Sequence, residues 1–135
     1  MRQKYLLDTN ICIFLLKNKC GIREAVITAK PENCFVSEIT IAELYYGASK
    51  SNRKKERLRD VDFIVENFGI LPIFPTLQIF GDIRSELEEK GKRIDDFDVL
   101  IGAAAVYNNM ILVTDNVQHL ERIPNIKIEN WTKPL

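Results

Sequence analysis

Tyr5-Leu6-Leu7-Asp8-Thr9-Asn10, near the start of the chain, joins a short apolar run to a polar turn. The apolar run predicts a buried strand, and Ile11, Phe14 and Leu15 follow it at helical spacing. A strand that passes directly into a helix is the first half of a unit whose strands lie parallel. Asp8 is therefore expected at the carboxyl end of a parallel strand.

The same alternation of strand and helix continues along the chain. Further strands are predicted at residues 34–37, 70–74, 111–114 and 126–128, and helices at residues 40–48, 53–67, 75–90 and 95–107. Gly47 is expected to stop the first of these helices. The strands are continuous apolar runs, as in parallel sheets covered on both faces. We therefore predict an α/β fold with three α/β/α layers around a mainly parallel sheet of four to five strands, its edge closed by residues 129–135.

The composition is that of an ordinary globular protein, and one domain over residues 1–135 is expected. Lysine plus arginine and aspartate plus glutamate number 19 each, so a nucleic-acid partner would need a local basic patch. Cys12, Cys20 and Cys34 lack zinc-site spacing, which indicates reduced thiols in the cytoplasm. The first residues do not resemble a signal peptide and no apolar run is long enough to cross a membrane, so no membrane association is expected.

Acidic residues follow or precede the predicted strands at positions that share one rim of the sheet. Asp8 follows the first strand, Glu43 comes soon after the second, and Asp98 opens the helix that leads to the strand at 111–114. Asp115 and Asn116 follow that strand. Because ligands bind beyond the carboxyl ends of parallel strands, these residues are candidates for one functional site.

Each carboxylate also has a structural interpretation, because acids near helix N-termini cap free N–H groups. Asp8 could cap the first helix, while Thr40 and Glu43 match a capping box in which Glu43 bonds the Thr40 N–H. Asp98 is harder to explain in this way, because its neighbours are apolar and Asp95 can serve as the cap. Both interpretations stay open for Asp8 and Glu43.

Carboxylates gathered on one rim repel each other, and a divalent cation removes that repulsion. Mg²⁺ prefers hard oxygen ligands and contacts substrate phosphates directly, so we predict Mg²⁺, with Mn²⁺ as the alternative. No rival catalytic set is apparent in the sequence. His119 is the only histidine and is expected to be a structural or surface residue, and the six glycines form no phosphate-binding loop.

Several short motifs occur in a fixed order: Leu6-Leu7-Asp8-Thr9-Asn10, Ser37-Glu38-Ile39-Thr40, Ala42-Glu43-Leu44, Gly47, Gly91, Ile94, Phe97-Asp98, Leu112-Val113-Thr114, Glu121-Arg122-Ile123-Pro124 and Glu129-Asn130-Trp131. Their order and spacing resemble those of the PIN-domain ribonucleases, and among them the VapC toxins of bacterial VapBC modules. The resemblance runs over most of the chain. One motif alone would be weak evidence for the resemblance, but the motifs together are specific for this family.

The resemblance implies a PIN-like domain and a Mg²⁺-dependent endoribonuclease in which Asp8, Glu43 and Asp98 are the catalytic metal ligands. Many relatives carry a fourth acid where this chain has Asn116, with Asp115 one position earlier. Either residue could face the metal, and the change favours one metal ion over two. Asp95 and Asp96 stand where the family often has no acid, so an extra carboxylate near the pocket is expected.

Polar and basic residues beside these acids are expected to orient the ligands or contact the substrate, namely Thr9, Asn10, Thr114, Lys92 and Arg93. A second basic cluster lies between Lys50 and Arg59. A solvated helix face explains this cluster as well as RNA binding does. Two basic regions are therefore candidates for the RNA contact.

The resemblance also implies partners. VapC-like toxins usually form homodimers, and a VapB-like antitoxin inhibits them by laying its C-terminal segment across the toxin and inserting a basic residue into the acidic pocket. RNA is the expected substrate, with tRNA, and initiator tRNA at its anticodon loop in particular, as the leading candidate. Tyr45 and Tyr46 beside Glu43 could form an apolar contact surface or pack in the core.

Two other functions fit parts of the sequence. A degenerate PIN module would bind RNA or a protein without cleavage; Asn116 favours it, but the retained Asp8, Glu43 and Asp98 argue against it. An aspartyl phosphatase of the haloacid-dehalogenase type also begins with an aspartate after its first strand. That class expects a second acid where this chain has Asn10, which argues against it.

Overall fold

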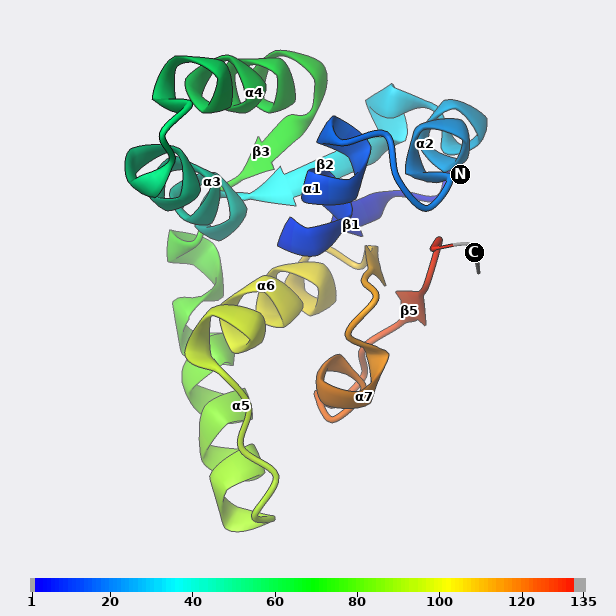
Figure 1. Ribbon diagram of the computed structural model, residues 1–135. Coiled ribbons are helices and arrows are strands. Elements are labelled where there is room, and N and C mark those ends of the chain that lie inside the picture. The colour runs from blue at the N-terminus through cyan, green and yellow to red at the C-terminus, as the bar shows by residue number, and fades with distance from the viewer. Residues whose placement is uncertain (1, 133–135) are drawn as a thin grey trace.

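The structure is a computed structural model that describes residues 2–132. Its parallel strands form one sheet in the order β3-β2-β1-β4-β5, with bounds Tyr5–Leu7 (β1), Cys34–Ser37 (β2), Gly69–Leu71 (β3), Ile111–Val113 (β4) and Ile128–Glu129 (β5). The chain builds outward from β1 to β3 and then returns to place β4 beside β1 (Figure 1). The strand order therefore reverses between β1 and β4, which is where open parallel sheets bind ligands.

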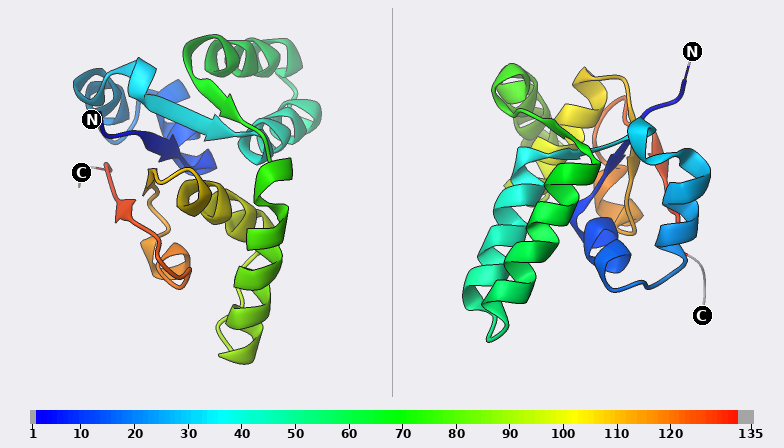
Figure 2. Two further views of the ribbon diagram at one scale, coloured as in Figure 1. Left: turned by 180° about the vertical axis from the view of Figure 1, so that it is seen from behind. Right: turned by 90° about the horizontal axis from the view of Figure 1, so that it is seen from above.

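Helices cover both faces of the sheet. Within residues 2–132 they are α1 (Thr9–Leu16), α2 (Ile22–Ala29), α3 (Glu38–Lys50), α4 (Lys54–Asn67), α5 (Leu77–Glu89), α6 (Asp96–Tyr107) and α7 (Val117–Leu120), with 3₁₀ turns at Pro31–Asn33 and Phe74–Thr76. Helices α1, α2 and α4 pack on one face, and α5, α6 and α7 pack on the other (Figure 2). The predicted three-layer α/β/α fold with a parallel sheet is confirmed.

The core forms two apolar layers because successive strand residues point to opposite faces. Leu6 and Leu112 lie in the layer beneath α5 and α6, whereas Leu7 and Val113 lie in the layer beneath α1 and α2. All four side chains are fully buried. Both faces of the sheet are therefore apolar, as the uninterrupted strand sequences predicted.

Two local predictions are wrong, and one helix was not predicted. Helix α3 runs through Gly47 to Lys50, where Ser51 caps it, so the glycine does not stop the helix. The third strand is Gly69–Leu71 rather than residues 70–74, because Phe74–Thr76 turns into a 3₁₀ helix that leads to α5. Helix α2 was not predicted, since it follows Gly21 in a left-handed conformation and has no side-chain cap.

The C-terminal strand closes one edge of the sheet, as expected. Strand β5 pairs only with β4 in the described sheet, and Trp131 packs edge-on against Tyr5 with ring centroids 5.0 Å apart. Residues 133–135 of the predicted edge segment lie outside the described residues.

Gly102 lies where α6 meets the segment after α7. A Cβ atom at this position would lie 2.2 Å from Cδ1 of Ile123, which is itself buried. The close approach of the two segments therefore depends on the absence of a side chain at Gly102.

The cysteines Cys12, Cys20 and Cys34 are free thiols, as predicted. Among the helices of residues 2–132, none has the length and apolar composition needed to cross a membrane.

Candidate metal centre

Asp8 lies at the carboxyl end of β1, and both of its carboxylate oxygens are held in place. Its Oδ1 accepts a 2.8 Å hydrogen bond from the Thr9 backbone N–H, so Asp8 caps α1. Its Oδ2 accepts a 2.7 Å hydrogen bond from the Thr114 hydroxyl, just after β4. The side chain is only 6% exposed. Capping and ligation are compatible here, because each carboxylate oxygen has a second lone pair.

Glu43 lies in the second turn of α3 and does not cap that helix. Ser37 caps α3 by accepting a 3.0 Å hydrogen bond from the Ile39 N–H, so the capping-box interpretation of Thr40 and Glu43 is wrong. Glu43 Oε1 instead accepts a 2.7 Å hydrogen bond from the Thr9 hydroxyl. Glu43 is thus tied to the residue that follows Asp8.

Thr40 supports this arrangement from inside the protein. Its buried hydroxyl lies 3.0 Å from the Thr9 hydroxyl. Because the Thr9 hydroxyl has one hydrogen and gives it to Glu43, Thr40 donates to Thr9. This role of Thr40 was not predicted; the available signal was its position three residues before Glu43, on the same side of a helix.

Asp98 lies in the first turn of α6. The cap of this helix is Asp95, whose Oδ2 accepts a 3.1 Å hydrogen bond from the Phe97 N–H, as predicted. Asp98 therefore does not cap α6. Its side chain is partly buried and lies near Asp8 and Glu43. Figure 1 shows α1, α3 and α6 gathered around the carboxyl ends of β1 and β2.

Burial, with added repulsion from neighbouring acids, raises the pKa values of all three carboxylates. Burial, followed by repulsion from Asp8, Asp95 and Glu43, raises the pKa of Asp98 to about 6. Burial also raises the pKa of Glu43, with Asp8 and Asp95 adding to the shift and the Thr9 hydrogen bond opposing it. The pKa of Asp8 rises because of burial despite its two hydrogen bonds. Negative charge is therefore concentrated on this rim.

Asp115 and Asn116 take different positions beside Asp8. Asn10 Nδ2 donates a 3.5 Å hydrogen bond to Asp115 Oδ1, and repulsion from Asp115 contributes to the raised pKa of Asp8. Asn116 donates its backbone N–H to the Thr114 hydroxyl at 3.0 Å. The Asp115 side chain therefore lies close to the carboxylates, while Asn116 contacts the site through its backbone.

In the part of the chain that the structure describes, no three His, Cys, Asp or Glu side chains are arranged to hold a metal ion by themselves. The donors are nevertheless hard oxygens, and their raised pKa values indicate charge that a cation would neutralise. The donor chemistry therefore fits a divalent cation that completes its coordination with waters.

A hollow of about 490 Å³ opens beside Asp98, and its wall includes Arg93 and His119. Lys92 lies in a neighbouring hollow with Arg122. The prediction that His119 lies on the surface is confirmed, but its position beside Asp98 was not foreseen. In the other basic region, between Lys50 and Arg59, the arginines Arg53 and Arg57 form ion pairs with acids of α4.

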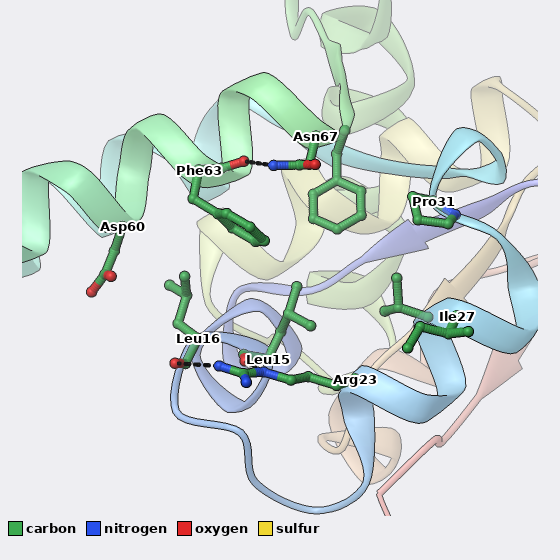
Figure 3. Close-up of a pocket in the computed structure, with 10 residues that line it drawn as sticks. Leu15, Leu16, Arg23, Ile27, Pro31, Asp60, Phe63 and Asn67 are labelled. Atoms are coloured by element: carbon green, nitrogen blue, oxygen red, sulfur yellow. Dashed lines mark hydrogen bonds between the residues drawn. The ribbon is translucent and has the colours of Figure 1, made fainter.

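A separate apolar groove lies between α1, α2 and α4 (Figure 3). It encloses about 490 Å³ and is lined mainly by Leu15, Leu16, Val26, Ile27, Pro31, Phe63 and Phe68. Ile27 is 71% exposed, which is unusual for a large apolar side chain. A smaller hollow shares Leu16 and Asp60 with this groove, and Glu43 is among the residues that line it. Tyr45 and Tyr46 lie on the surface rather than in the core.

A parallel α/β/α fold with a carboxylate rim at its strand-order reversal is suited to metal-assisted chemistry on phosphate esters, with nucleases as one class that uses it. Residues 5–125 match the family model of the PIN domain. The chain is 36% identical to Ribonuclease VapC2 of Rickettsia felis over 96% of this chain and 98% of the relative. It is 38% identical to the tRNA(fMet)-specific endonuclease VapC of Salmonella typhimurium, over 95% and 98%.

Solved structures lead to the same family. VapBC2 from Rickettsia felis, bound to a DNA fragment from its promoter, matches with a TM-score of 0.87 and 34% identity over 96% of this chain and 99% of the other. DNA-bound VapBC from Salmonella typhimurium matches with a TM-score of 0.88 and 37% identity, over 96% and 98%. The chain belongs to the PIN-domain family, among the ribonucleases of the VapC type. Its assignment as a metal-dependent nuclease is confirmed, and the phosphatase alternative is wrong.

Proposed function

We propose that the chain acts as a single-domain toxin of a type II toxin–antitoxin module and cleaves RNA phosphodiester bonds in the cytoplasm with Mg²⁺, or Mn²⁺ in its place. Asp8, Glu43 and Asp98 are the proposed ligands. The observation that carries the proposal is that Asp8 lies close enough to Glu43 and Asp98, which are on separate elements, to raise the pKa values of both. Structural carboxylates without a cation would be a costly arrangement at this density.

The neighbouring hydroxyls support distinct roles for the three acids. Thr114 and the Thr9 N–H fix both oxygens of Asp8, and the Thr9 hydroxyl orients Glu43. Asp98 or Glu43 would accept a proton from the attacking water. A bound divalent cation would supply charge neutralisation at the phosphate and make a coordinated water more acidic.

We favour one tightly held metal ion, with Asp115 rather than Asn116 as an additional acid near it. Asp115 lies close enough to Asp8 to affect its pKa, and Asn10 holds the Asp115 carboxylate by a 3.5 Å hydrogen bond. Asn116 contributes a backbone contact to Thr114 instead.

We propose tRNA as the substrate class, because two relatives of this chain are named tRNA(fMet)-specific endonucleases. An antitoxin of the VapB kind is the proposed inhibitor, since the solved relatives are VapBC complexes. The apolar groove between α1, α2 and α4 supports this, because it shares Leu16 and Asp60 with a hollow whose lining includes Glu43. We propose that the antitoxin segment lies in this groove and extends toward Glu43. We expect the toxin itself to be a homodimer.

The proposal is tested with purified protein and labelled RNA. The wild type is expected to cleave with Mg²⁺, to stop on addition of EDTA and to recover when Mg²⁺ is restored. Asp8→Asn and Asp98→Asn are expected to lose at least about a hundredfold in rate, as typical for loss of a metal ligand. Asp62→Asn, an exposed acid of α4, is the matched control and should cleave normally.

Two outcomes would overturn the assignment. Equal cleavage by the wild type and both ligand variants would remove these acids from the mechanism. Tight RNA binding by the wild type without cleavage at any Mg²⁺ or Mn²⁺ concentration would instead support a degenerate binding module, the alternative that Asn116 favours. Circular dichroism of each variant excludes loss of the fold as the cause.

A further inference from the structure

Two hollows lie beside α7, and Asp98 of the acidic centre lines the first of them. The first has a volume of about 490 Å³ and its wall includes Asp98, Arg93 and His119. The second, of about 520 Å³, is lined by Gly91, Lys92, Gln118, Glu121 and Arg122. Residues next to each other in the sequence, Lys92 and Arg93 on one side and Gln118 and His119 on the other, line the two hollows. Arg122 Nη1 joins the walls by a 3.5 Å hydrogen bond to the Arg93 carbonyl.

The charge along this path changes from acidic to basic with distance from Asp98. Near Asp98, the acids are already engaged: Asp95 caps α6, and Asp96 lies 3.4 Å from Arg84 Nε. Arg93 contacts Glu88 and Asp96 only at 3.9 Å and remains half exposed. Farther out, Lys92 and Arg122 form no ion pair within residues 2–132. Glu121 is the one acid that lines the outer hollow among the described residues.

The other basic region is only partly paired with acids. Arg57 Nε lies 3.2 Å from Asp60 Oδ2, and both Arg53 and Arg57 contact Glu56. Lys54, Lys55 and Arg59 form no ion pair among the described residues. What distinguishes the basic residues beside α7 is therefore their place next to the hollow that Asp98 lines.

We propose that the RNA strand on one side of the scissile phosphate lies along α7, in the path lined by Lys92, Arg93, Gln118, His119 and Arg122, which we name the α7 track. This inference rests on the proposed ribonuclease function. It assigns the path that the bound RNA strand follows away from the scissile phosphate. Arg93 and His119 contact the phosphate next to the cleaved one, and Lys92 and Arg122 contact the following one. An imidazole ring has an N–H donor in either charge state, so His119 can donate at any working pH.

The track is tested by RNA binding in the Asp98→Asn background, where the probe stays intact. Fluorescence anisotropy with a fluorescein-labelled oligoribonucleotide of mixed sequence and with labelled tRNA measures the Kd. Arg93→Ala, Lys92→Ala and His119→Ala should each weaken binding about threefold or more, and the Lys92→Ala/Arg93→Ala pair should lower the salt dependence by about one to two released ions. Glu121→Gln should strengthen binding, because it removes the opposing charge.

The matched control is Arg53→Ala/Lys54→Ala on α4, which removes the same charge as the Lys92→Ala/Arg93→Ala pair. It should change the Kd by less than about twofold. An equal or larger loss in this control, or unchanged binding in the track variants, would overturn the track. Failure of the wild type to cleave RNA would overturn only the proposed function. The Kd values of the Asp98→Asn variants can still be compared, because the binding assay does not depend on cleavage. Thermal melts confirm that each variant is folded.

Discussion

Thr9 Oγ1 donates a 2.7 Å hydrogen bond to Glu43 Oε1, joining the first turn of α1 to the second turn of α3. Thr9 also provides the backbone N–H that Asp8 accepts, so one residue orients two of the three proposed ligands. Thr40 completes the chain of hydroxyls from inside the protein. Groups that orient a ligand in this way commonly affect metal affinity nearly as much as the ligand itself.

Replacing Thr9 by valine keeps the shape of the side chain and removes its hydroxyl. We expect Thr9→Val to lower metal affinity or cleavage rate roughly tenfold, because Glu43 loses its donor and Thr40 loses its acceptor. Mg²⁺ titration of the cleavage rate measures the effect. Thr9→Ser, which retains the hydroxyl, should recover most of the activity. Wild-type Mg²⁺ dependence in Thr9→Val would contradict the orienting role.

The raised pKa of Asp98 predicts a pH-dependent stability of the metal-free protein. The folded pKa of about 6 exceeds the ordinary value of 3.8, so between these values the folded state binds more protons than the unfolded state. The free energy of unfolding therefore falls as the pH rises through about 6, because Asp98 becomes charged in the folded state. We expect Asp98→Asn to match the wild type in Tm near pH 4 and to exceed it above pH 6.

Thermal melts in EDTA across this pH range measure the Tm of both proteins. Taking the difference in Tm between them at each pH removes the contribution of titrating groups that both proteins share. Adding Mg²⁺ should raise the Tm of the wild type above pH 6 and leave Asp98→Asn nearly unchanged. A constant Tm difference at all pH values would contradict the assigned cause of the shift.

Gly102→Ala should destabilise the fold, although alanine is the better helix former. Alanine gains up to about 1 kcal/mol in helix propensity. Its Cβ would lie 2.2 Å from Ile123 Cδ1, and overpacking of a buried contact costs about 1–3 kcal/mol. Urea denaturation is expected to give a net loss of about 1 kcal/mol.

Ile123→Val provides the control, because it removes the Cδ1 atom that alanine would meet. In the Ile123→Val background, Gly102→Ala should be neutral or stabilising. The same loss in both backgrounds would show that the contact with Ile123 is not the cause.

The apolar groove predicts a variant that separates inhibition from cleavage. Ile27→Glu introduces a charge into the groove at a side chain that is 71% exposed, so the fold should tolerate it. We expect antitoxin binding to weaken about tenfold or more, with RNA cleavage unchanged. Phe74→Glu, at a more exposed apolar residue outside the groove, is the control and should leave antitoxin affinity unchanged. Isothermal titration with the cognate antitoxin measures both, and equal losses would contradict the groove assignment.

The strands and the acidic rim could be predicted from the sequence because each depends on a local pattern. Apolar runs such as Tyr5–Leu7 and Ile111–Val113 mark buried parallel strands, and the residue after such a strand lies on the rim by geometry alone. Asp98 could be singled out because a carboxylate among apolar neighbours needs an explanation.

The features that were missed depend on contacts between distant residues. The hydroxyl of Thr40 meets that of Thr9 across 31 positions, and His119 reaches Asp98 only because α7 packs beside α6. Gly47 did not end α3 because packing of α3 against α4 outweighs a helix penalty of about 1 kcal/mol. No local pattern carries this information.

The hydrogen bond from Thr114 to Asp8 also governs when the protein can become active. The two residues are 106 positions apart, and they meet only after β4 has paired with β1. Glu43 and Asp98 lie on α3 and α6, which both follow β1 in the chain. A growing chain therefore cannot form the contact between Asp8 and Thr114 until Thr114 has left the ribosome and β4 has paired with β1. The order of synthesis thus sets the earliest moment at which the proposed metal centre can be complete.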